Sequence, residues 1–535
     1  MKKTNYSLYH NKEIKTIKEL LLYSNEQYKN ETAFIYPINR KEDASKTFYE
    51  FVSDVNALGT YFHSLGLNNC HIAVYGENSY EWILTHFAVT CGKNVVVPID
   101  KELDASSIYK LLIDSECKTI VYSDTYSDVV SELEQMQFAD MSFIKMSELQ
   151  KYIVEGLKLI DNGYTDYINI EINQNDLASI VYTSGTTGKS KGVMLSHYNF
   201  CSDMCSATGN VLLEGSSLLV LPLHHTFGLV AGVFSEMFYG CPIYINKSLK
   251  NISKDFLKCK PQHLFAVPLI VETLYKNIWS NAQNQGKDKL LKLLVKISDN
   301  LLKLKIDLRK TFFKSVINAF GGSVDLIVSG GAPIDEKYIR GFNSFGITVL
   351  NGYGITECGP IVAVNRNKFN IIGSVGLPLK CNKIKISEDG EVLVKGNNVM
   401  LGYYHNEEEN NKVFSNGWFK TGDIGEIDEF GALHITGRIK NLIILANGEN
   451  IAAETIEKAV CSISYVKEVV AFENDGTIAI EVYLDESFQS AEQKIHNDIE
   501  KLNRTLPVTQ NIGKVIIRDT EFPKTTTKKI KRKYN

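Results

Sequence analysis

The chain has 535 residues, a formal net charge of -4 and an apolar share of 44%. This length exceeds what one hydrophobic core organises and predicts about three or four packing units. The nearly balanced charge gives no indication of a nucleic-acid partner. Ten cysteines without CxxC pairs or Cys/His clusters indicate neither a zinc site nor a disulfide framework. We therefore expect an ordinary globular protein with reduced thiols.

The amino-terminal region has none of the features of a secretion signal. Residues 1–24 carry charges throughout and lack the continuous apolar core that such a signal needs. The most apolar long window, residues 228–245, is interrupted by Glu236 and Pro242, which favours a buried helix followed by a strand. The sequence thus predicts a cytoplasmic protein without a membrane span.

Residues 71–124 alternate between strand and helix. The helix at 78–92 is expected to open at Asn78, with Glu81 three residues later as in a capping box. Together with the strands on either side and a second helix at 103–117, this βαβαβ pattern predicts a largely parallel sheet with right-handed crossovers. Residues 130–175 are less periodic and are expected to form a connecting excursion with helices.

Residues 179–198, SIVYTSGTTGKSKGVMLSHY, join an apolar strand to a loop suited to phosphate. Its donors, close-approach glycines and charges are Thr183, Ser184, Gly185, Thr186, Thr187, Gly188, Lys189 and Lys191. Two residues separate Gly185 from Gly188, whereas a Walker A loop needs four between its glycine and its Gly-Lys pair. The pattern predicts a triphosphate cradle of a different type. Taken alone, it is equally compatible with a flexible surface loop.

Two later segments end strands in residues that suit a nucleotide. DLIVSGGAPI, residues 325–334, ends in Gly330 and Gly331, where an adenine ring can lie against the backbone. NGYGITECGP, residues 351–360, adds an aromatic ring and a carboxylate, the groups that hold a purine and Mg²⁺. Upstream, residues 217–229 form a strand that runs into Pro222 and His225. A histidine in such a place is, by itself, more often structural than catalytic.

Three further regions complete the chain. Residues 283–320 alternate aliphatic residues with lysine at helical spacing, which predicts one or two amphipathic helices with a basic outer face. Most such helices are merely solvated, although a basic amphipathic surface can also contact anionic lipid. Residues 373–435 predict a small, distorted β-barrel, and the remainder predicts an α+β lobe of about one hundred residues.

In this order, the segments at 179–198, 217–229, 325–334 and 351–360 resemble the adenylate-forming enzymes, which include acyl-CoA synthetases, adenylation domains of peptide synthetases and luciferases. The similarity extends from about residue 15 to the C-terminus and is greatest to the long-chain fatty acyl-CoA synthetases. It implies an α/β fold with a large domain, residues 1–436, built from parallel and mixed sheets, helices and the small barrel. A hinge at 437–441 and a mobile α+β domain at 442–535 are expected to follow.

The resemblance also implies roles for individual residues. Thr186, His225, Glu357 and Lys529 are expected to be catalytic, with His225 positioning carboxylate and phosphate and Glu357 holding the metal. The ATP-binding set is expected to be Thr183, Ser184, Gly185, Thr187, Gly188, Lys191, Gly331, Ala332, Pro333, Asn351, Gly352, Tyr353, Gly354, Thr356, Asp423 and Arg438. In this set Tyr353 stacks on adenine, Thr356 contacts the α-phosphate, and Asp423 and Arg438 bind the ribose.

The carboxyl-terminal domain is expected to turn at Lys440 and to bring Lys529 into the active site during adenylation. Lys528 stands where the family has glycine. The loop at 447–450 is expected to face the pantetheine tunnel. The implied activity is an ATP- and Mg²⁺-dependent ligase that joins a long-chain fatty acid to coenzyme A. The alternatives are an enzyme that loads a separate carrier protein and a non-catalytic nucleotide- or acyl-binding protein. Acyl chain length and oligomeric state do not follow from the sequence.

Overall fold

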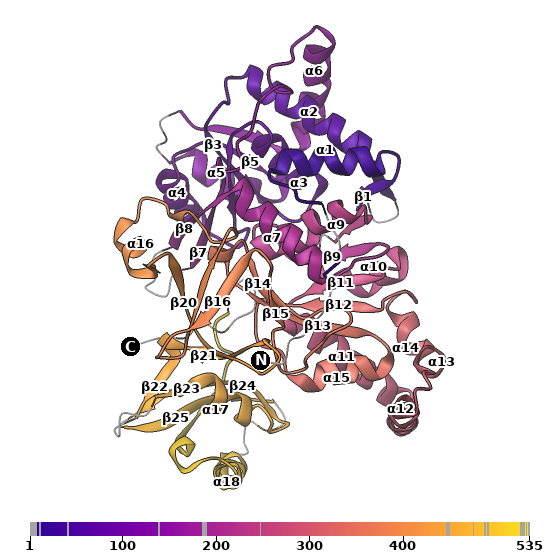
Figure 1. Ribbon diagram of the computed structural model, residues 1–535, viewed down its shortest axis with the longest axis vertical. Helices are drawn as coiled ribbons and strands as arrows, with labels where there is room; N and C mark the ends of the chain where they lie inside the picture. The colour runs from indigo at the N-terminus through magenta and orange to yellow at the C-terminus, as the bar shows by residue number, and fades with distance from the viewer. Residues whose placement is uncertain are drawn as a thin grey trace. The chain divides into compact units, whose positions relative to one another are not determined.

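The computed structural model describes residues 8–9, 12–39, 42–136, 138, 140–184, 190–246, 248–445, 450–474, 476–485, 488, 492–524, 530 and 532. The chain divides into two compact units (Figure 1). The large unit comprises Thr4–Lys383 and Val394–Gly417, and the small unit comprises Met1–Lys3, Ile384–Leu393 and Trp418–Asn535.

A seven-stranded sheet of the large unit carries the predicted βαβαβ pattern. Its order is β18 (Gly402–Tyr403), β8 (Ser190–Ser196), β7 (Leu177–Ser184), β4 (Val95–Ile99), β3 (His71–Tyr75), β5 (Cys117–Tyr122) and β6 (Ser142–Lys145). Strands β7, β4, β3, β5 and β6 are parallel, whereas β8 and β18 add antiparallel pairs at one edge. Helices α3 (Tyr80–Thr90) and α4 (Ala105–Asp114) form the crossovers.

The cap of α3 differs from the expectation. The hydroxyl of Ser79, not a side-chain group of Asn78, accepts the hydrogen bond from the backbone N–H of Trp82. The Asn78 amide instead donates to the carbonyl of Leu221 at 2.8 Å, and its oxygen accepts from the N–H of Leu223 at 3.1 Å. Asn78 therefore fixes the segment that leads to His225, a long-range role that local spacing does not reveal.

A nine-stranded sheet forms the other half of the large unit. Its order is β15 (Leu377–Pro378), β14 (Ile361–Val364), β13 (Thr348–Gly354), β12 (Leu326–Ser329), β11 (His263–Ala266), β9 (Ser217–Leu219), β10 (Ile243–Ile245), β1 (Thr32–Pro37) and β2 (Asp43–Thr47). The strands from β13 to β1 are parallel, and the edges are antiparallel. The carboxyl ends of β9, β11, β12 and β13 therefore share one edge, where ligands bind in sheets of this kind.

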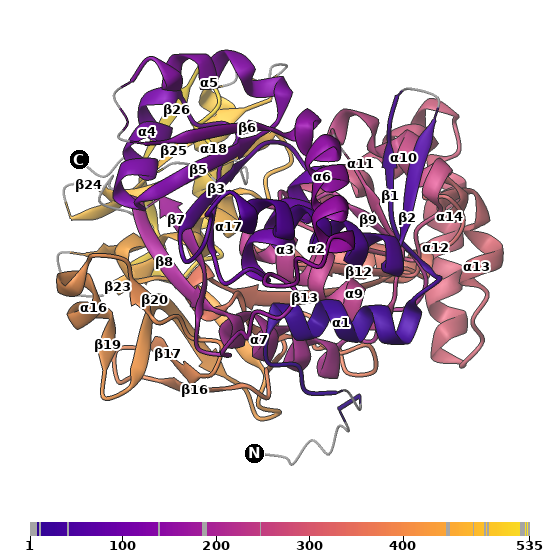
Figure 2. The same ribbon diagram turned by 90° about the horizontal axis from the view of Figure 1, so that it is seen from above.

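Helices cover both sheets of the large unit (Figures 1 and 2). They are α1 (Ile17–Tyr28), α2 (Phe48–Ser64), α5 (Ser127–Glu134), α6 (Leu149–Asp161), α7 (His197–Asn210), α8 (Thr226–Leu229), α9 (Ser235–Tyr239), α10 (Ile252–Cys259), α11 (Pro268–Asn284), α12 (Asp288–Lys303), α13 (Arg309–Phe312), α14 (Lys314–Ala319), α15 (Glu336–Phe345) and α16 (Glu407–Val413). A π-helical segment, η3 (Val230–Phe234), lies between α8 and α9. Helices α2 and α6 pack so closely that a Cβ at Gly156 would stand 1.9 Å from the carbonyl oxygen of Ala57.

The small unit contains the expected α+β lobe. Strands β24 (Val466–Asn474), β25 (Thr477–Leu484) and β26 (Ile512–Arg518) form a sheet, with α17 (Ala453–Val460) and α18 (Glu492–Asn503) beside it. The short strands β22 (Leu442–Ile444) and β23 (Asn450–Ala452) pair with each other. Before them, β20 (Trp418–Ile427) pairs with β21 (Leu433–Arg438). Across the described part of the chain, no helix has both the length and the apolar character needed to cross a membrane.

Candidate active site

The predicted phosphate loop connects two paired strands. Thr183 of β7 lies opposite Lys191 of β8, and Ser184 lies opposite Ser190. Gly185, Thr186, Thr187 and Gly188 lie outside the described residues, as does the side chain of Ser184. The antiparallel pairing therefore holds both ends of the loop at the edge of the seven-stranded sheet and places Lys191 directly after it.

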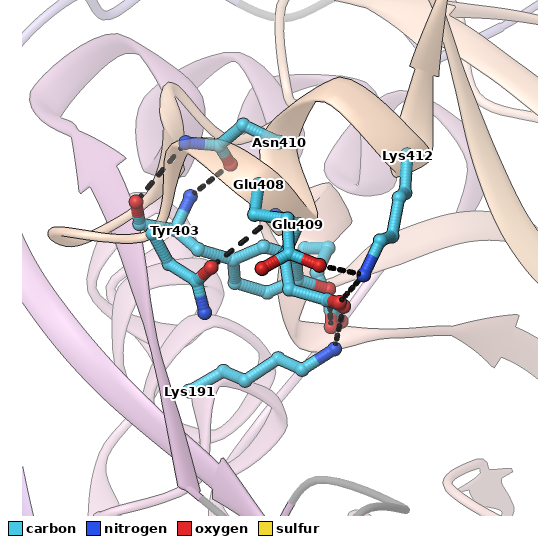
Figure 3. Close-up of polar contacts among 8 residues, drawn as sticks. Lys191, Tyr403, Glu408, Glu409, Asn410 and Lys412 are labelled. Carbon is cyan, nitrogen blue, oxygen red and sulfur yellow. Dashed lines mark hydrogen bonds and ion pairs between the residues drawn. The ribbon is translucent and has the colours of Figure 1, made fainter.

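The ammonium group of Lys191 contacts the side chains of Tyr403 and Glu409, which lie about two hundred residues later in the sequence (Figure 3). It is ion-paired with the carboxylate of Glu409 on α16, and it stands 5.1 Å from the centre of the Tyr403 ring. The other oxygen of Glu409 accepts from Lys412 at 3.0 Å. The hydrogen bonds from Lys191 and Lys412 lower the pKa of Glu409, so this carboxyl group is ionised at neutral pH.

Glu357, the predicted magnesium ligand, lies in the short 3-10 turn η5 (Thr356–Cys358) that follows β13. The Tyr403 hydroxyl donates to its Oε1 at 2.9 Å, and the N–H of Met400 donates to its carbonyl at 2.8 Å. Burial and the charge of Glu357 raise the pKa of Tyr403, so its hydroxyl remains a donor. A carboxylate oriented by a second group is the usual way a protein presents an oxygen ligand to Mg²⁺. Glu357 therefore fits the metal.

Helix α16 is fixed to the strand that leaves the phosphate loop. The Asn410 side chain makes two hydrogen bonds with the backbone of Tyr403, at 2.7 and 3.1 Å. Asn406 caps the helix by accepting from the N–H of Glu409 at 3.2 Å. Strand β18 pairs with β8 at Val193 and Met194. Lys191, Tyr403 and Glu357 consequently form one row across β8, β18 and η5.

A pocket at the carboxyl edge of the nine-stranded sheet unites the predicted adenine motifs with apolar side chains. Its lining residues are Ala207, Thr208, Val211, Leu213, Phe227, Ala231, Ser235, Phe265, Val328, Ser329, Gly330, Gly331, Gly352, Tyr353, Gly354, Pro360, Ile361 and Val364. Gly331 has a φ of +89°, which a side chain would strain, and a Cβ on Gly354 would stand 2.0 Å from the carbonyl oxygen of Pro360. Both glycines are therefore required by the backbone path around the pocket.

None of these lining residues carries a charge, and few are polar. The hydroxyl of Thr208 donates to the carbonyl of Met204 at 3.0 Å, and that of Ser235 donates to the carbonyl of Val230 at 3.0 Å. The buried hydroxyl of Ser329 has no hydrogen-bond partner among the described residues. Ser329 is thus one pocket hydroxyl that can still donate a hydrogen bond to a ligand.

His225 caps the start of α8, two residues before the pocket residue Phe227. Its ring centre lies 4.2 Å from that of the buried His224, whose Nε2 is 3.5 Å from Oδ1 of Asp100. Burial and the neighbouring His225 lower the pKa of His224 well below its ordinary value, so His224 is neutral. The structure therefore places His225 two residues before the pocket residue Phe227, and His225 itself is not among the lining residues.

The predicted residues Asn351, Ala332 and Pro333 lie outside the lining of the pocket. The side-chain amide of Asn351 donates to the carbonyl of Ser374 at 3.1 Å, and the backbone carbonyl of Asn351 accepts from the N–H of Asn365 at 3.0 Å. Ala332 and Pro333 follow Gly331 in the chain without lining the pocket. Asn351 thus braces the end of β13.

In the small unit, the structure pairs the two predicted ribose residues with each other. Asp423 and Arg438 are register partners on β20 and β21, and Arg438 Nε lies 2.8 Å from Asp423 Oδ1. Asp423 is buried, and its N–H donates to the Thr421 hydroxyl at 3.1 Å. Lys440 lies in the turn η6 (Ile439–Asn441) that directly follows β21.

The predicted catalytic Lys529 and its neighbour Lys528 lie outside the described residues, as do Asn447, Gly448 and Glu449. On either side of Lys529 a described residue contacts the small unit, Lys524 through an ion pair with Glu468 of β24 and Arg532 through Glu457. Lys524 and Ile530 form an antiparallel bridge, and Arg532 donates to Glu457 of α17 at 2.6 Å.

Comparison with known proteins identifies the family. The profile of the AMP-binding enzyme family matches residues 22–404, and that of the AMP-binding enzyme C-terminal domain matches residues 440–534. The chain belongs to the AMP-binding enzyme family. The expected resemblance to adenylate-forming enzymes and the expected α/β fold are therefore confirmed.

Curated AMP-binding relatives differ in the acid that their names specify. Long-chain-fatty-acid–CoA ligase FadD15 of Mycobacterium bovis is 30% identical over 77% of this chain and 72% of the relative. The 2-succinylbenzoate–CoA ligase of Listeria monocytogenes is 28% identical over 94% of this chain and 95% of the relative. Among solved structures, Bacillus subtilis O-succinylbenzoate coenzyme A synthetase in complex with ATP and magnesium has a TM-score of 0.73 at 23% identity, covering 96% and 98% of the two chains.

Within this AMP-binding enzyme, the predicted site residues fall into two groups. Lys191, Glu357, Gly331, Tyr353 and His225 belong to the large unit, and Asp423, Arg438 and Lys440 belong to the small unit. Sequence reasoning missed Tyr403, Glu409 and Ser329. A run of three glutamates at the start of α16 was the only local signal for Glu409, and nothing in its spacing linked it to Lys191.

Proposed function

We propose that this AMP-binding enzyme is a cytoplasmic, ATP- and Mg²⁺-dependent ligase that activates a long-chain fatty acid as acyl-AMP and transfers the acyl group to coenzyme A. The observation that carries the proposal is the single pocket shared by Gly331, Tyr353 and an apolar wall. Glycine backbone and the Tyr353 ring form one part of this cavity, and they suit a nucleotide base. Aliphatic side chains form another part, and they suit a hydrocarbon chain.

The uncharged lining favours a fatty acid over an acid with a second carboxylate. A buried carboxylate needs a cation or several donors to offset its lost hydration. Among the described residues the lining offers no cation, and two of its four side-chain hydroxyls, those of Thr208 and Ser235, already donate to backbone carbonyls. An aliphatic chain needs no such partners. For this reason we favour the substrate class named by FadD15 over that named by the 2-succinylbenzoate ligase.

The first half-reaction joins a carboxylate oxygen to the α-phosphorus of ATP as the bond to the pyrophosphate oxygen breaks. Catalysis of this step is mainly alignment and neutralisation of charge on the phosphate oxygens. Thr183 and Lys191 border the phosphate loop, Thr356 and Glu357 follow β13, and His225 precedes the pocket residue Phe227 by two positions. Glu357 would hold Mg²⁺, which when bound would supply charge neutralisation at the phosphates. Lys529 is the cation that we assign to the small unit in this step.

The second half-reaction needs a thiol in place of pyrophosphate. The sulfur of coenzyme A attacks the acyl carbon of the mixed anhydride, the thioester bond forms, and the bond to the AMP oxygen breaks. We assign Lys440 as the hinge about which the small unit rotates between the two steps, so that a different surface of this unit faces the substrates in each step. This sequence of steps requires no covalent bond between acyl group and enzyme.

A substrate panel tests the proposal. Saturated acids from acetate to stearate and 2-succinylbenzoate are each incubated with MgATP, and AMP is measured with and without coenzyme A. We expect AMP release that depends on a long-chain acid and is stimulated by coenzyme A. Turnover of 2-succinylbenzoate alone contradicts the fatty-acid assignment. Adenylation without coenzyme A consumption points to a carrier-protein acceptor, and no pyrophosphate release with any acid indicates a binding protein without turnover.

A further inference from the structure

Helix α12 has two apolar faces, and the protein covers only one of them. Leu291, Leu294 and Val295 pack against the core cluster that includes Phe345. Leu290 and Leu293 are each 53% exposed, although they too lie on this helix. An amphipathic helix on a globular protein normally has a single apolar face, directed at the core. The second face therefore needs an explanation.

The exposed aliphatic residues form a continuous stripe. Leu290, Leu293 and Ile297 are spaced i, i+3 and i+7, which places them on one side of the helix. The stripe continues beyond the helix into the turn before α13. Its members are Leu290, Leu293, Ile297, Leu304, Ile306 and Leu308, all exposed. We refer to these six residues as the α12 stripe. Both views place α12, α13 and α14 at the periphery of the large unit (Figures 1 and 2).

A lysine precedes five members of the α12 stripe, so that a basic ridge runs alongside it. These lysines are Lys289, Lys292, Lys296, Lys303 and Lys305. Among the described residues, no carboxylate lies within ion-pair distance of Lys289, Lys292, Lys296 or Lys305. Residues 287–314 contain nine Lys and Arg against three Asp, a net charge of +6 in a chain whose total is -4.

We propose that the α12 stripe and its lysine ridge dock the enzyme on the surface of an anionic lipid bilayer. Aliphatic side chains enter the boundary between headgroups and acyl chains, while lysines beside them reach lipid phosphates. The charge argues against a second copy of this chain as the occupant, because a symmetric contact would bring two segments of net charge +6 together. The absence of a long apolar helix in the described chain agrees with contact at the surface rather than insertion across it.

The docking surface is independent of the proposed activity. None of its residues lines the pocket or contacts Lys191, Glu357 or Tyr403. Co-sedimentation of the full-length protein with vesicles therefore tests it without turnover. The vesicles are phosphatidylcholine alone, or phosphatidylcholine with 30 mol% phosphatidylglycerol. We expect binding to the anionic vesicles, little binding to the neutral ones, and weakening in high salt.

Two variants, each with several substitutions, separate the contributions of the α12 stripe and the lysine ridge. Leu293→Gln with Ile297→Gln removes aliphatic contacts, and its matched control is Leu22→Gln with Leu65→Gln, at residues of similar exposure on α1 and after α2. Lys289→Gln with Lys292→Gln and Lys296→Gln removes three charges, and its matched control is the same change at the exposed Lys110, Lys151 and Lys383. We expect each α12 variant to bind anionic vesicles at least fivefold more weakly, and each control to bind like the unaltered protein.

Three results would overturn the proposal. These are no binding of the unaltered protein to anionic vesicles, equal binding by the α12 variants and their controls, and weakening by the lysine variant alone. The last result would mean that the ridge attracts polyanions, such as an acidic protein, without apolar contact. A Leu293→Trp variant gives a second measurement, because quenching of its fluorescence by brominated acyl chains requires the stripe to reach the hydrocarbon. Unchanged thermal midpoints of all variants establish that each one is folded.

Discussion

At the scale of single residues, Lys191 makes contacts that the sequence did not indicate. Lys191 was expected to bind ATP, and the structure pairs its ammonium with Glu409 and places it 5.1 Å from the centre of the Tyr403 ring. Glu409 in turn is held by Lys412 and by the cap of its own helix. We interpret this pair as a support that keeps Lys191 directed along the edge of β8, where the phosphates of ATP are expected.

Glu409→Gln tests this role of Glu409. The amide keeps the shape of the side chain but loses the charge that orients Lys191, so we expect the KM for ATP to rise about fivefold with little change in kcat. Glu408→Gln is the matched control, because Glu408 pairs with Lys412 on the same helix but does not reach Lys191. An unchanged or lower KM in the Glu409 variant would show instead that Glu409 competes with ATP for Lys191.

Tyr403→Phe isolates the hydroxyl that orients Glu357. Phenylalanine retains the ring beside Lys191 and removes only the donor 2.9 Å from the carboxylate. Loss of such a supporting group typically lowers metal affinity about 10-fold or more, so we expect the Mg²⁺ concentration for half-maximal activity to rise by about that factor. The control is Tyr404→Phe, whose hydroxyl donates to Glu116 at 2.8 Å. Equal Mg²⁺ dependence of the two variants would exclude a metal-orienting role.

At the scale of elements, a buried ion pair joins α9 to β11. His263 Nε2 lies 2.8 Å from Oε1 of Glu236, and its Nδ1 lies 3.1 Å from the carbonyl oxygen of Glu214. Cys241 completes a buried trio whose donor atoms lie within 4.8 Å of one another. Burial alone would lower the pKa of His263, but the charge and hydrogen bond of Glu236 raise it above the ordinary value.

The sign of this shift predicts how stability changes with pH. A raised pKa in the folded state means that the contribution of the pair is complete below about pH 6.5 and is lost as the pH rises through the folded value. His263→Gln leaves Glu236 buried without its cation, at a cost of about 3 kcal/mol or more at pH 6. We expect the gap in thermal midpoint from the unaltered protein to narrow by pH 9. His405→Gln, at an exposed position, is the control, and a pH-independent gap would contradict the assignment.

The elements show where sequence reasoning succeeds. Local periodicity was sufficient for the helix and strand around Pro242 and for the crossovers α3 and α4, because each depends on residues close in the chain. It wrongly assigned the cap of α3 to Asn78, because the contact of that side chain with Leu221 forms only in the folded protein. The π-helical segment beside the pocket, where Ala231 lines the wall, has no periodic signal of its own. Partners such as His263 and Glu236 are likewise set by packing.

At the scale of the whole molecule, the proposed reaction divides between the two units. The large unit contributes the pocket, Lys191 and Glu357, and the small unit contributes Asp423, Arg438 and the segment that contains Lys529. The family resemblance supplied the order of the motifs, but it assigned Asp423 to the large domain at 1–436 and Arg438 to the hinge at 437–441, whereas the structure groups both with the small unit. The contacts of Tyr403, Glu409 and Ser329 could be found only from the folded structure, because these residues lie on strands and helices that are distant in sequence.

Lys529→Ala separates the two half-reactions. If this lysine serves only adenylation, the variant loses acid-dependent pyrophosphate release by about 100-fold or more, as expected when a cation at a transferring phosphate is removed. Thioester formation from supplied acyl-AMP is expected to continue at nearly the normal rate. Equal loss of both steps would contradict the assignment. Lys528→Ala is the control for the neighbouring charge.

Lys440→Pro tests whether the backbone at Lys440 acts as the hinge. Proline restricts φ to about -65° and so limits rotation at this residue. We expect one half-reaction to persist while the other falls at least tenfold, measured as pyrophosphate release and as thioester formation from supplied acyl-AMP. The control is Lys440→Ala, which removes the charge without restricting the backbone. A parallel decline of both rates in the proline variant would indicate local damage and no hinge.

The contacts that flank Lys529 determine how this residue can be delivered. Lys524 is ion-paired with Glu468 of β24 and Arg532 donates to Glu457 of α17, so described residues on both sides of Lys529 are bound to the small unit. Arg532→Ala removes the contact on the carboxyl-terminal side, and we therefore expect it to weaken adenylation while Lys529 itself is intact.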